Sequence, residues 1–441
     1  MQEWLWASAA DLGRAIGDGE IEPAALTRVY LDAIEAHPLR DRIYARVTAD
    51  RAMEEAWAAE KRAKDGRRLS SLDGVPVSWK DLFDTAGVAT EAGTRLIEGR
   101  VPEADAKVLQ YAAGQGLVCL GKTHMSEIAF SGLGINPVTQ TPPNLHDPDG
   151  APGGSSSGAA ASVAFGLAAA AIGSDTGGSV RVPSAWNDLV GFKPGHGQLP
   201  TTGVVPLCET FDTVGPLVRS VADAAALYAA LGGPGVDLKG VSLEGCRFLV
   251  IGTVLEEGLE DAPASAFASA LDRLAQAGAT VDRADWPALA EAYDMAGAIY
   301  SADAWSWWGP MVEAKGELMF DRIRERVSAG RDVGAAEYLA HWRRLRALRQ
   351  DYAALSAGYD AVLCPTVPIM PPNVEMMLDD AQAYVTANLM ALRNTRLANL
   401  MGLASMSLPT GIPATGLCLN VPTGQEARLL RIGAAAERAL A

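Results

Sequence analysis

Short β-type runs alternate with amphipathic helical segments along most of this chain, and this alternation limits the folds open to it. Apolar residues recur at helical intervals over residues 21–37 and 50–64, and residues 74–80 then form a short β-type run. The same alternation continues downstream, in helices at 104–113, 222–231 and 265–276 and in strands at 117–120, 248–251 and 360–363. Strands that alternate with helices form parallel or mixed sheets. We therefore predict an α/β fold with a central, twisted, mixed sheet and helices on both faces.

We expect residues 1–441 to form a single domain, because no linker or repeat divides the chain. Within it, residues 1–65 are predicted to be an N-terminal helical segment and residues 66–232 a core. Residues 287–357 have a helical pattern throughout and are predicted to be an insertion that covers the core. Residues 136–157 are rich in proline and glycine and too long for an ordinary connection, so they are predicted to form a functional loop.

The charge balance excludes one class of function. The chain has 37 basic and 53 acidic residues, a formal net charge of −16. A surface of this sign repels phosphate backbones, so we expect no direct contact with nucleic acid. Apolar residues make up 49% of the chain, which is enough to bury a core and is typical of a folded globular protein.

The cysteines and the apolar runs bear on location. The five cysteines form no C-x-x-C pair, so neither a disulfide framework nor a zinc site is predicted, and a reducing cytoplasm is expected. Residues 1–13 do not have the features of a signal peptide. The longest apolar run, residues 159–172, is shorter than the ~20 residues that a membrane helix needs, so no membrane association is predicted.

Two common motifs occur in unsuitable surroundings. Residues 116–123, GLVCLGKT, match the phosphate-binding pattern G-x-x-x-x-G-K-[ST], but residues 117–120 are predicted to be a strand and not a loop. A nucleotide-binding role is therefore a remote alternative. Residues 154–158, GSSSG, match the nucleophile elbow G-x-S-x-G, but a loop precedes them where an elbow requires a strand. Only His196 and His341 follow, and neither lies in a conspicuous motif.

A stronger signal joins two serines and a lysine. Ser155 lies in GGSSSG, Ser179 follows 24 residues later in GSDTGGSVRVP, and Lys80 ends an upstream strand. A serine hydroxyl needs a base at neutral pH, and a lysine can be that base if burial keeps its amine neutral. Ser155 placed between the other two could relay a proton from Ser179 to Lys80 without any histidine. This arrangement predicts acyl transfer.

The glycines before Ser179 fit the same chemistry. The run DTGG, residues 175–178, presents backbone without bulky side chains, and successive N–H groups there could form an oxyanion hole for a tetrahedral intermediate. Arg181 has two interpretations, and we favour a structural ion pair with Asp175 over contact with the substrate.

Ordered motifs over most of the chain resemble the amidase signature family. They are GVPVSWKD at 74–81, GKTHMSE at 121–127, GGSSSG at 153–158, GSDTGGSVRVP at 173–183, GFKP at 191–194, FDTVGP at 211–216 and LCPT at 363–366. The resemblance implies the amidase signature fold and a catalytic role for the core. It also implies that Ser179 is the nucleophile, Ser155 a bridging serine that follows a cis peptide bond, and Lys80 the base. The implied oxyanion hole is the backbone of Thr176, Gly177 and Gly178.

Substrate-binding residues are less well defined. By resemblance, Ser131 and Gly132 are candidates to line the pocket, although they could simply end a helix. The resemblance implies that the helix carrying Arg393 and Arg396 lies on the active-site side of the fold, where a guanidinium could bind a substrate carboxylate. The alternative is that both arginines face solvent. The tryptophans at 305, 307 and 308 are interpreted as helix packing or a dimer interface, and less readily as an aromatic pocket.

These observations predict an amidase that hydrolyses the C–N bond of a small carboxamide or ureido substrate through a seryl acyl-enzyme. Residues 125–137 are similar to those of small-amide hydrolases such as 1-carboxybiuret hydrolase. The alternative is the A subunit of a glutamyl-tRNA(Gln) or aspartyl-tRNA(Asn) amidotransferase, which would pass ammonia within a complex. No metal or organic cofactor is expected. A homodimer or a small partner subunit is considered possible.

Overall fold

The centre of the molecule is one sheet of eleven strands, seen in a computed structural model that describes residues 2–441. The strands lie in the order β1-β3-β2-β4-β6-β5-β10-β11-β9-β7-β8. Their bounds are β1 (Tyr44–Val47), β2 (Pro76–Lys80), β3 (Val118–Thr123), β4 (Ala170–Asp175), β5 (Val190–Lys193), β6 (Thr213–Val218), β7 (Arg247–Ile251), β8 (Thr280–Ala284), β9 (Ala361–Pro365), β10 (Leu403–Pro409) and β11 (Gly416–Pro422). β2 is parallel to β3 and β4, β7 is parallel to β8 and β9, and the other pairs are antiparallel. The predicted mixed sheet is confirmed.

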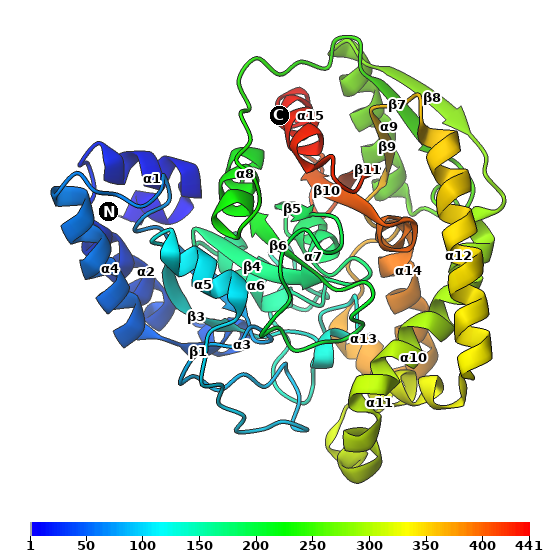
Figure 1. Ribbon diagram of the computed structural model, residues 1–441, viewed down its shortest axis with the longest axis horizontal. Coiled ribbons are helices and arrows are strands. Elements are labelled where there is room, and N and C mark those ends of the chain that lie inside the picture. Colours follow the sequence, from blue (N-terminus) through cyan, green and yellow to red (C-terminus); the bar gives the residue numbers. More distant parts are fainter. Residues whose placement is uncertain (1) are drawn as a thin grey trace.

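Helices flank this sheet along its whole width (Figure 1). They are α1 (Ala9–Gly17), α2 (Pro23–Ala36), α3 (Arg40–Ile43), α4 (Ala49–Lys64), α5 (Lys107–Gly114), α6 (Ser157–Ala164), α7 (Arg181–Trp186), α8 (Val221–Ala230), α9 (Asp261–Gln276), α10 (Leu289–Lys315), α11 (Asp321–Ser328), α12 (Ala335–Ser356), α13 (Val374–Asp379), α14 (Ala381–Met401) and α15 (Glu426–Leu440). Four short 3-10 helices add to them, at Gln2–Trp6, Glu127–Ala129, Gly316–Leu318 and Ala329–Asp332. No helix within residues 2–441 is both long and apolar enough to cross a bilayer.

The segments expected from the sequence differ in detail from the observed ones. Residues 287–357 consist mainly of α10, α11 and α12 with short 3-10 turns between them. Figure 1 shows α10 and α12 far from the N-terminal helices α1, α2 and α4. The N-terminal segment also contributes β1, an edge strand that pairs with β3 and was not predicted.

The Ala-rich run at 159–172 is divided between a helix and a strand. Every residue of α6 is buried, and small side chains let this helix lie close to its neighbours. A Cβ atom at Gly158 would lie 2.6 Å from the carbonyl oxygen of Ile43, so only glycine fits there. Gly166, with φ +72°, then ends the helical part, and the chain enters β4. β4 lies inside the sheet, between β2 and β6.

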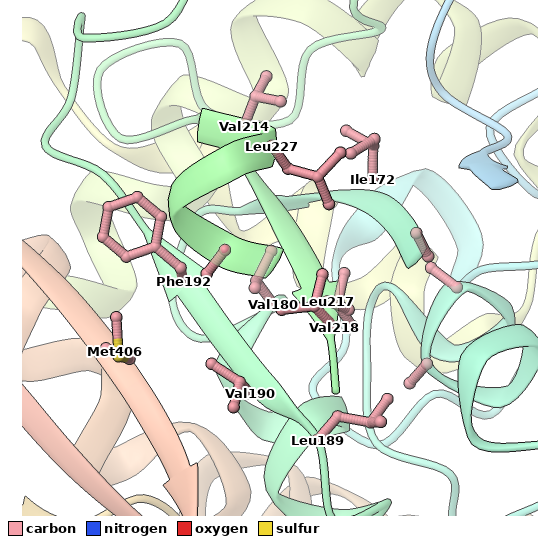
Figure 2. Packing of buried hydrophobic residues seen from close by; sticks show 14 of the residues in the cluster. Ile172, Val180, Leu189, Val190, Phe192, Val214, Leu217, Val218, Leu227 and Met406 are labelled. Carbon is pink, nitrogen blue, oxygen red and sulfur yellow. The ribbon is translucent and has the colours of Figure 1, made fainter. Parts of the chain in front are cut away.

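Large apolar side chains fix the central strands in place. Figure 2 shows Phe192 on β5, Val214 and Leu217 on β6, Leu227 on α8 and Met406 on β10 in one cluster. All five are at most 1% exposed. Burying each such side chain contributes about 1.5–3 kcal/mol, so this layer is a rigid support for the loops at the strand ends.

The phosphate-loop pattern at 116–123 is part of the sheet. β3 covers residues 118–123, and the side chain of Lys122 is fully buried. Its Nζ lies 3.1 Å from Asp81 Oδ1 and donates a hydrogen bond to Thr90 Oγ1 at 2.8 Å. A phosphate-binding loop needs free backbone N–H groups around an exposed lysine. These residues therefore do not form one.

Candidate active site

Lys80, the last residue of β2, is fully buried. Its Nζ donates hydrogen bonds to Ser155 Oγ at 2.7 Å and to Ser174 Oγ at 2.8 Å. Ser174 is near the end of β4, which is parallel to β2, and the carboxyl ends of parallel strands meet at one edge of a sheet. Within residues 2–441 the Lys80 amine therefore contacts two hydroxyls and forms no ion pair with a carboxylate.

The surroundings of Lys80 favour its neutral form. Burial lowers the pKa of Lys80 to about 7, although the negative charges of Asp212 and Asp175 raise it in part. An ammonium group in the protein interior loses its hydration, and hydroxyl partners replace that only in part. A large fraction of the amine is therefore neutral at pH 7 and can accept a proton.

Ser155 lies between Lys80 and the segment that carries Ser179. The peptide bond between Gly154 and Ser155 is cis. The carbonyl oxygen of Ser155 accepts a hydrogen bond from the Ser126 N–H, and the Ser156 N–H donates to the Ser179 carbonyl oxygen at 3.2 Å. No hydrogen bond joins the Oγ atoms of Ser155 and Ser179 in the described part of the chain, so the observed link between these segments is through the backbone.

The loop after β4 is shaped by a buried ion pair. Arg181 donates from Nε and one terminal nitrogen to the two oxygens of Asp175, at 2.9 and 2.8 Å, and both side chains are fully buried. Burial raises the pKa of Asp175, but the charge and hydrogen bonds of Arg181, the charge of Lys193 and a hydrogen bond from Asn399 together lower it to about 2. Asp175 also accepts the N–H groups of Gly178 and Val180. The structural interpretation of Arg181 is thus the observed one.

Gly178 is required by this loop. Its φ is +141°, and a Cβ atom there would lie 2.1 Å from Thr395 Oγ1 on α14. Because the Gly178 N–H donates to Asp175, it is not available to a ligand while that bond is made. Among residues 2–441, the N–H groups of Thr176, Gly177 and Ser179 make no hydrogen bond, so these three remain free to donate.

Side chains around the loop after β4 form hydrogen bonds with the carbonyl groups of Thr176 and Gly177 and with the Thr176 hydroxyl. Tyr300 donates from its hydroxyl to the Thr176 carbonyl oxygen at 3.0 Å, and Thr395 donates to the Gly177 carbonyl oxygen at 2.9 Å. The Thr176 hydroxyl donates to Asp212, whose other oxygen accepts the N–H groups of Leu207 and Cys208. These hydrogen bonds fix the orientation of the peptide groups on either side of Gly177, next to the N–H groups that have no partner.

A cavity of about 20 Å³ lies next to Ser179. Besides Thr176, Gly177 and Ser179, its walls include Phe130, Ser131, Tyr300, Arg326, Leu392 and Arg396. The predicted residues Ser131 and Arg396 therefore lie at the site. The Ser131 hydroxyl accepts a hydrogen bond from Tyr384 at 2.7 Å, which orients it.

The other two predicted substrate-binding residues are not in this wall. The Gly132 N–H donates to Asn388 Oδ1 at 2.7 Å, so Gly132 supports the wall from behind. The guanidinium of Arg393 donates to the backbone carbonyl oxygens of Glu257 and Leu255 and does not line the cavity. Arg393 and Arg396 are neighbours on the surface of one helix. Arg393 is turned to the backbone of residues 255–257, and only Arg396 lines the cavity.

Ser174, Tyr300 and Arg326 are among the site residues that were not predicted. Ser174 binds Lys80, and its only signal in the sequence was its place beside Asp175 in a matched motif. Tyr300 and Arg326 come from α10 and α11, more than 100 residues after Ser179. Helical spacing alone gives no information on which face of an insertion meets a distant loop, so no signal identified them.

Two larger cavities lie nearby. One of about 430 Å³ shares Tyr300, Arg326 and Arg396 with the cavity at Ser179. The other, of about 480 Å³, is lined by Trp307 and Trp308. Trp308 is buried and donates from its ring nitrogen to the Pro206 carbonyl oxygen at 2.9 Å, which fits the predicted packing role.

Known proteins resemble this chain over nearly its full length. The Amidase family profile matches residues 25–430. A 2-amino-5-chloromuconic acid deaminase from Comamonas testosteroni is 35% identical, and the alignment covers 96% of this chain and 95% of that protein. The A subunit of a glutamyl-tRNA(Gln) amidotransferase from Thermobifida fusca is 31% identical, with 100% and 97% covered. A crystal structure of an amidase superposes with a TM-score of 0.90 at 30% identity and covers 99% of this chain and 100% of the other.

Proposed function

This chain belongs to the amidase signature family, whose members hydrolyse amides, and we propose that it acts through an acyl-enzyme formed on Ser179. Ser155 is the proposed proton relay and Lys80 the proposed base. The observation that carries this proposal is the 2.7 Å hydrogen bond between Lys80 Nζ and Ser155 Oγ, in a setting that lowers the pKa of the amine to about 7. A base of that pKa is well matched to work near neutral pH.

In the proposed reaction, Ser179 Oγ attacks the amide carbonyl carbon while its proton passes to Ser155 Oγ, and the proton of Ser155 passes to Lys80 Nζ. The tetrahedral intermediate collapses as the C–N bond breaks. Its nitrogen receives the proton back along the same relay and leaves as ammonia or an amine. Water then attacks the ester carbonyl with the same proton movements in turn, which releases the acid and restores Ser179.

The proposed oxyanion hole uses the free N–H groups of the loop after β4. Thr176 and Gly177 keep the role inferred from the sequence, and the N–H of Ser179 joins them. We leave out Gly178, because its N–H donates to Asp175 at 2.9 Å. Each N–H aimed at a developing negative charge contributes about 2.7–4 kcal/mol to catalysis in comparable sites.

We propose that the substrate is a small carboxamide or ureido compound. The cavity of about 20 Å³ at Ser179 supports a compact group there. The relatives support release of ammonia as the common outcome, because one is named for deaminating an acid and the other for transferring an amide group.

The alternative is that the chain is the A subunit of a tRNA-dependent amidotransferase. It is favoured by the 31% identity, over the whole chain, to the A subunit from Thermobifida fusca. The deciding experiment is ammonia release by the purified chain from a panel of simple carboxamides and ureas, without tRNA or ATP. Our proposal expects turnover that is lost in Ser179→Ala. Turnover that requires charged tRNA and a second protein would favour the alternative.

A further inference from the structure

Arg396 is a largely buried arginine whose guanidinium has no partner within residues 2–441. It lies on α14, is 8% exposed and lines the cavity beside Ser179. Among residues 2–441 its side chain takes part in no hydrogen bond or ion pair. A guanidinium has five N–H donors, and burial of a charge without compensation is unfavourable. The donors of Arg396 are therefore available to a group that enters the cavity.

Arg326 brings a second positive charge to the same wall. One of its terminal nitrogens donates to the Phe130 carbonyl oxygen at 2.8 Å, and its guanidinium lies 4.1 Å from the centre of the Phe130 ring. No carboxylate within residues 2–441 forms an ion pair with it. Burial lowers the pKa of Arg326 to about 10, and the nearby charge of Arg396 contributes in the same sense. The two guanidinium groups therefore repel each other, and an anion between them would relieve that repulsion.

The buried Arg181 and the half-buried Arg219 have acceptors within the fold. Arg181 has Asp175, Asn399 and the Thr395 carbonyl oxygen as acceptors. Arg219 donates to several backbone carbonyl oxygens. Arg396 differs from both, and it is the one that faces the cavity of Ser179.

The two cavities that meet at these arginines differ greatly in size. The one at Ser179 has about 20 Å³ and the one beyond the arginines about 430 Å³. About 10–15 Å³ is needed to hold one water molecule, so the space at Ser179 suits an NH2 group without substituents. The larger cavity has room for the rest of a substrate. The single acidic residue in its wall is Asp294, which is exposed and forms no ion pair with Arg326 or Arg396.

We propose, on the premise of the amidase function above, that Arg326 and Arg396 bind a carboxylate of the substrate. The substrate class is then a short primary amide or ureide with a free carboxylate a few bonds from the scissile carbonyl, and the leaving group is ammonia. Guanidinium groups bind carboxylates with two parallel hydrogen bonds, which fixes both position and orientation.

The test compares amides that differ only in charge. Malonamate, succinamate and glutaramate are each paired with the neutral amide in which an isopropyl group replaces the carboxylate, such as 4-methylpentanamide for succinamate. For at least one chain length, kcat/KM for ammonia release should be about 10- to 100-fold higher for the acid than for its neutral pair. N-Methylsuccinamate should react at least about tenfold more slowly than succinamate, because the cavity at Ser179 has no room for the methyl group.

The variants Arg396→Gln and Arg326→Gln should each reduce the preference for the acid at least about tenfold. Arg396→Lys keeps the charge and should give an intermediate preference. The matched control is Arg324→Gln, which removes the same charge from α11 at a residue that pairs with Asp321 on the surface, and it should keep the wild-type preference. Thermal unfolding of each variant shows whether it is folded.

A binding measurement separates failure of this proposal from failure of the amidase function. Calorimetric titration of the full chain with succinate and glutarate should detect binding that Arg396→Gln weakens at least about tenfold. Hydrolysis of acid and neutral amides at equal rates, or wild-type protein that binds neither dicarboxylate, would overturn the carboxylate site. Carboxylate binding without hydrolysis of any amide would leave this site standing and count against the amidase proposal instead.

Discussion

Lys80, Lys122 and Lys193 are almost completely buried, and their amines have different hydrogen-bond and ion-pair partners. Lys122 forms an ion pair with Asp81, while Lys193 donates to the backbone carbonyl oxygens of Pro194 and Leu403. Burial lowers the pKa of Lys193 to about 7, as it does for Lys80. A lowered pKa therefore does not identify a base by itself. Only Lys80 contacts serine hydroxyls, and this contact is what supports the proposed role.

Replacement of this amine tests that role directly. Lys80→Met keeps the length of the side chain and removes its basic atom. We expect kcat for ammonia release to fall by at least about 10³-fold, because members of a proton relay act as a unit. Steady-state kinetics with a carboxamide substrate measures the loss, and circular dichroism with thermal unfolding checks that the fold is kept. A folded variant with more than about a tenth of wild-type kcat would remove Lys80 from the mechanism.

The pH dependence follows from the same pKa. Lys80 must be neutral to accept a proton, and its pKa is lowered to about 7. The activity of the enzyme should therefore rise with pH as the amine of Lys80 loses its proton. We expect kcat/KM to rise about tenfold per pH unit at acidic pH and to level off above pH ~7. A profile that is flat between pH 5 and 9, in a protein shown to remain folded, would contradict the assignment.

Asp212 provides a check on that profile, because burial raises its pKa to about 6 and it accepts a hydrogen bond from Thr176. If Asp212 caused the rise, Asp212→Asn would abolish it. If Lys80 causes it, the rise should remain and its midpoint should move to lower pH, because the negative charge of Asp212 raises the pKa of Lys80.

At the scale of elements, what could be predicted depended on how distinct the local pattern was. α2, α4, α8 and α9 were expected within a few residues of their observed bounds, because their apolar spacing is clear. The hairpin of β10 and β11 was missed. Small residues such as Ala404, Ser405 and Ser407 give β10 no clear alternation, and its place in the sheet comes from pairing with β5 and β11. Strand pairing between distant segments is not visible in local sequence.

The loop between β4 and α7 offers a matched pair of glycine substitutions. Gly178→Ala would place a Cβ atom 2.1 Å from Thr395 Oγ1 at a backbone φ of +141°, so it should destabilise the protein by about 2 kcal/mol or more. At Gly177 the nearest atom to an added Cβ is the Tyr300 hydroxyl oxygen at 3.9 Å, so Gly177→Ala should leave the free energy of unfolding nearly unchanged. Denaturant unfolding of both variants measures the difference. Equal stability of the two would mean that the loop is not held against α14.

At the scale of the whole molecule, the site joins three parts of the chain that are far apart in sequence. Lys80 comes from β2, Ser155 and Ser179 flank α6 and β4, and Arg326 and Arg396 come from α11 and α14. The first two parts carry compact motifs, so their residues could be proposed from sequence. The third depends on where α10, α11 and α14 meet the loop after β4, which local sequence does not specify. Arg326 was therefore not predicted, and the candidate Arg393 lies outside the cavity wall.

The whole molecule has a formal net charge of −16, while the walls of its cavity carry two arginines, and this contrast predicts a salt effect. The acidic surface repels an anionic substrate at long range, and ions screen exposed charges within about 10 Å at 0.1 M. Buried arginines are screened much less. Raising ionic strength from about 0.01 to 0.2 M should therefore increase kcat/KM for succinamate several-fold and leave that for 4-methylpentanamide unchanged. Steady-state assays in sodium chloride measure both. A fall in kcat/KM for succinamate alone would mean that attraction by the arginines extends beyond the cavity and outweighs the surface charge.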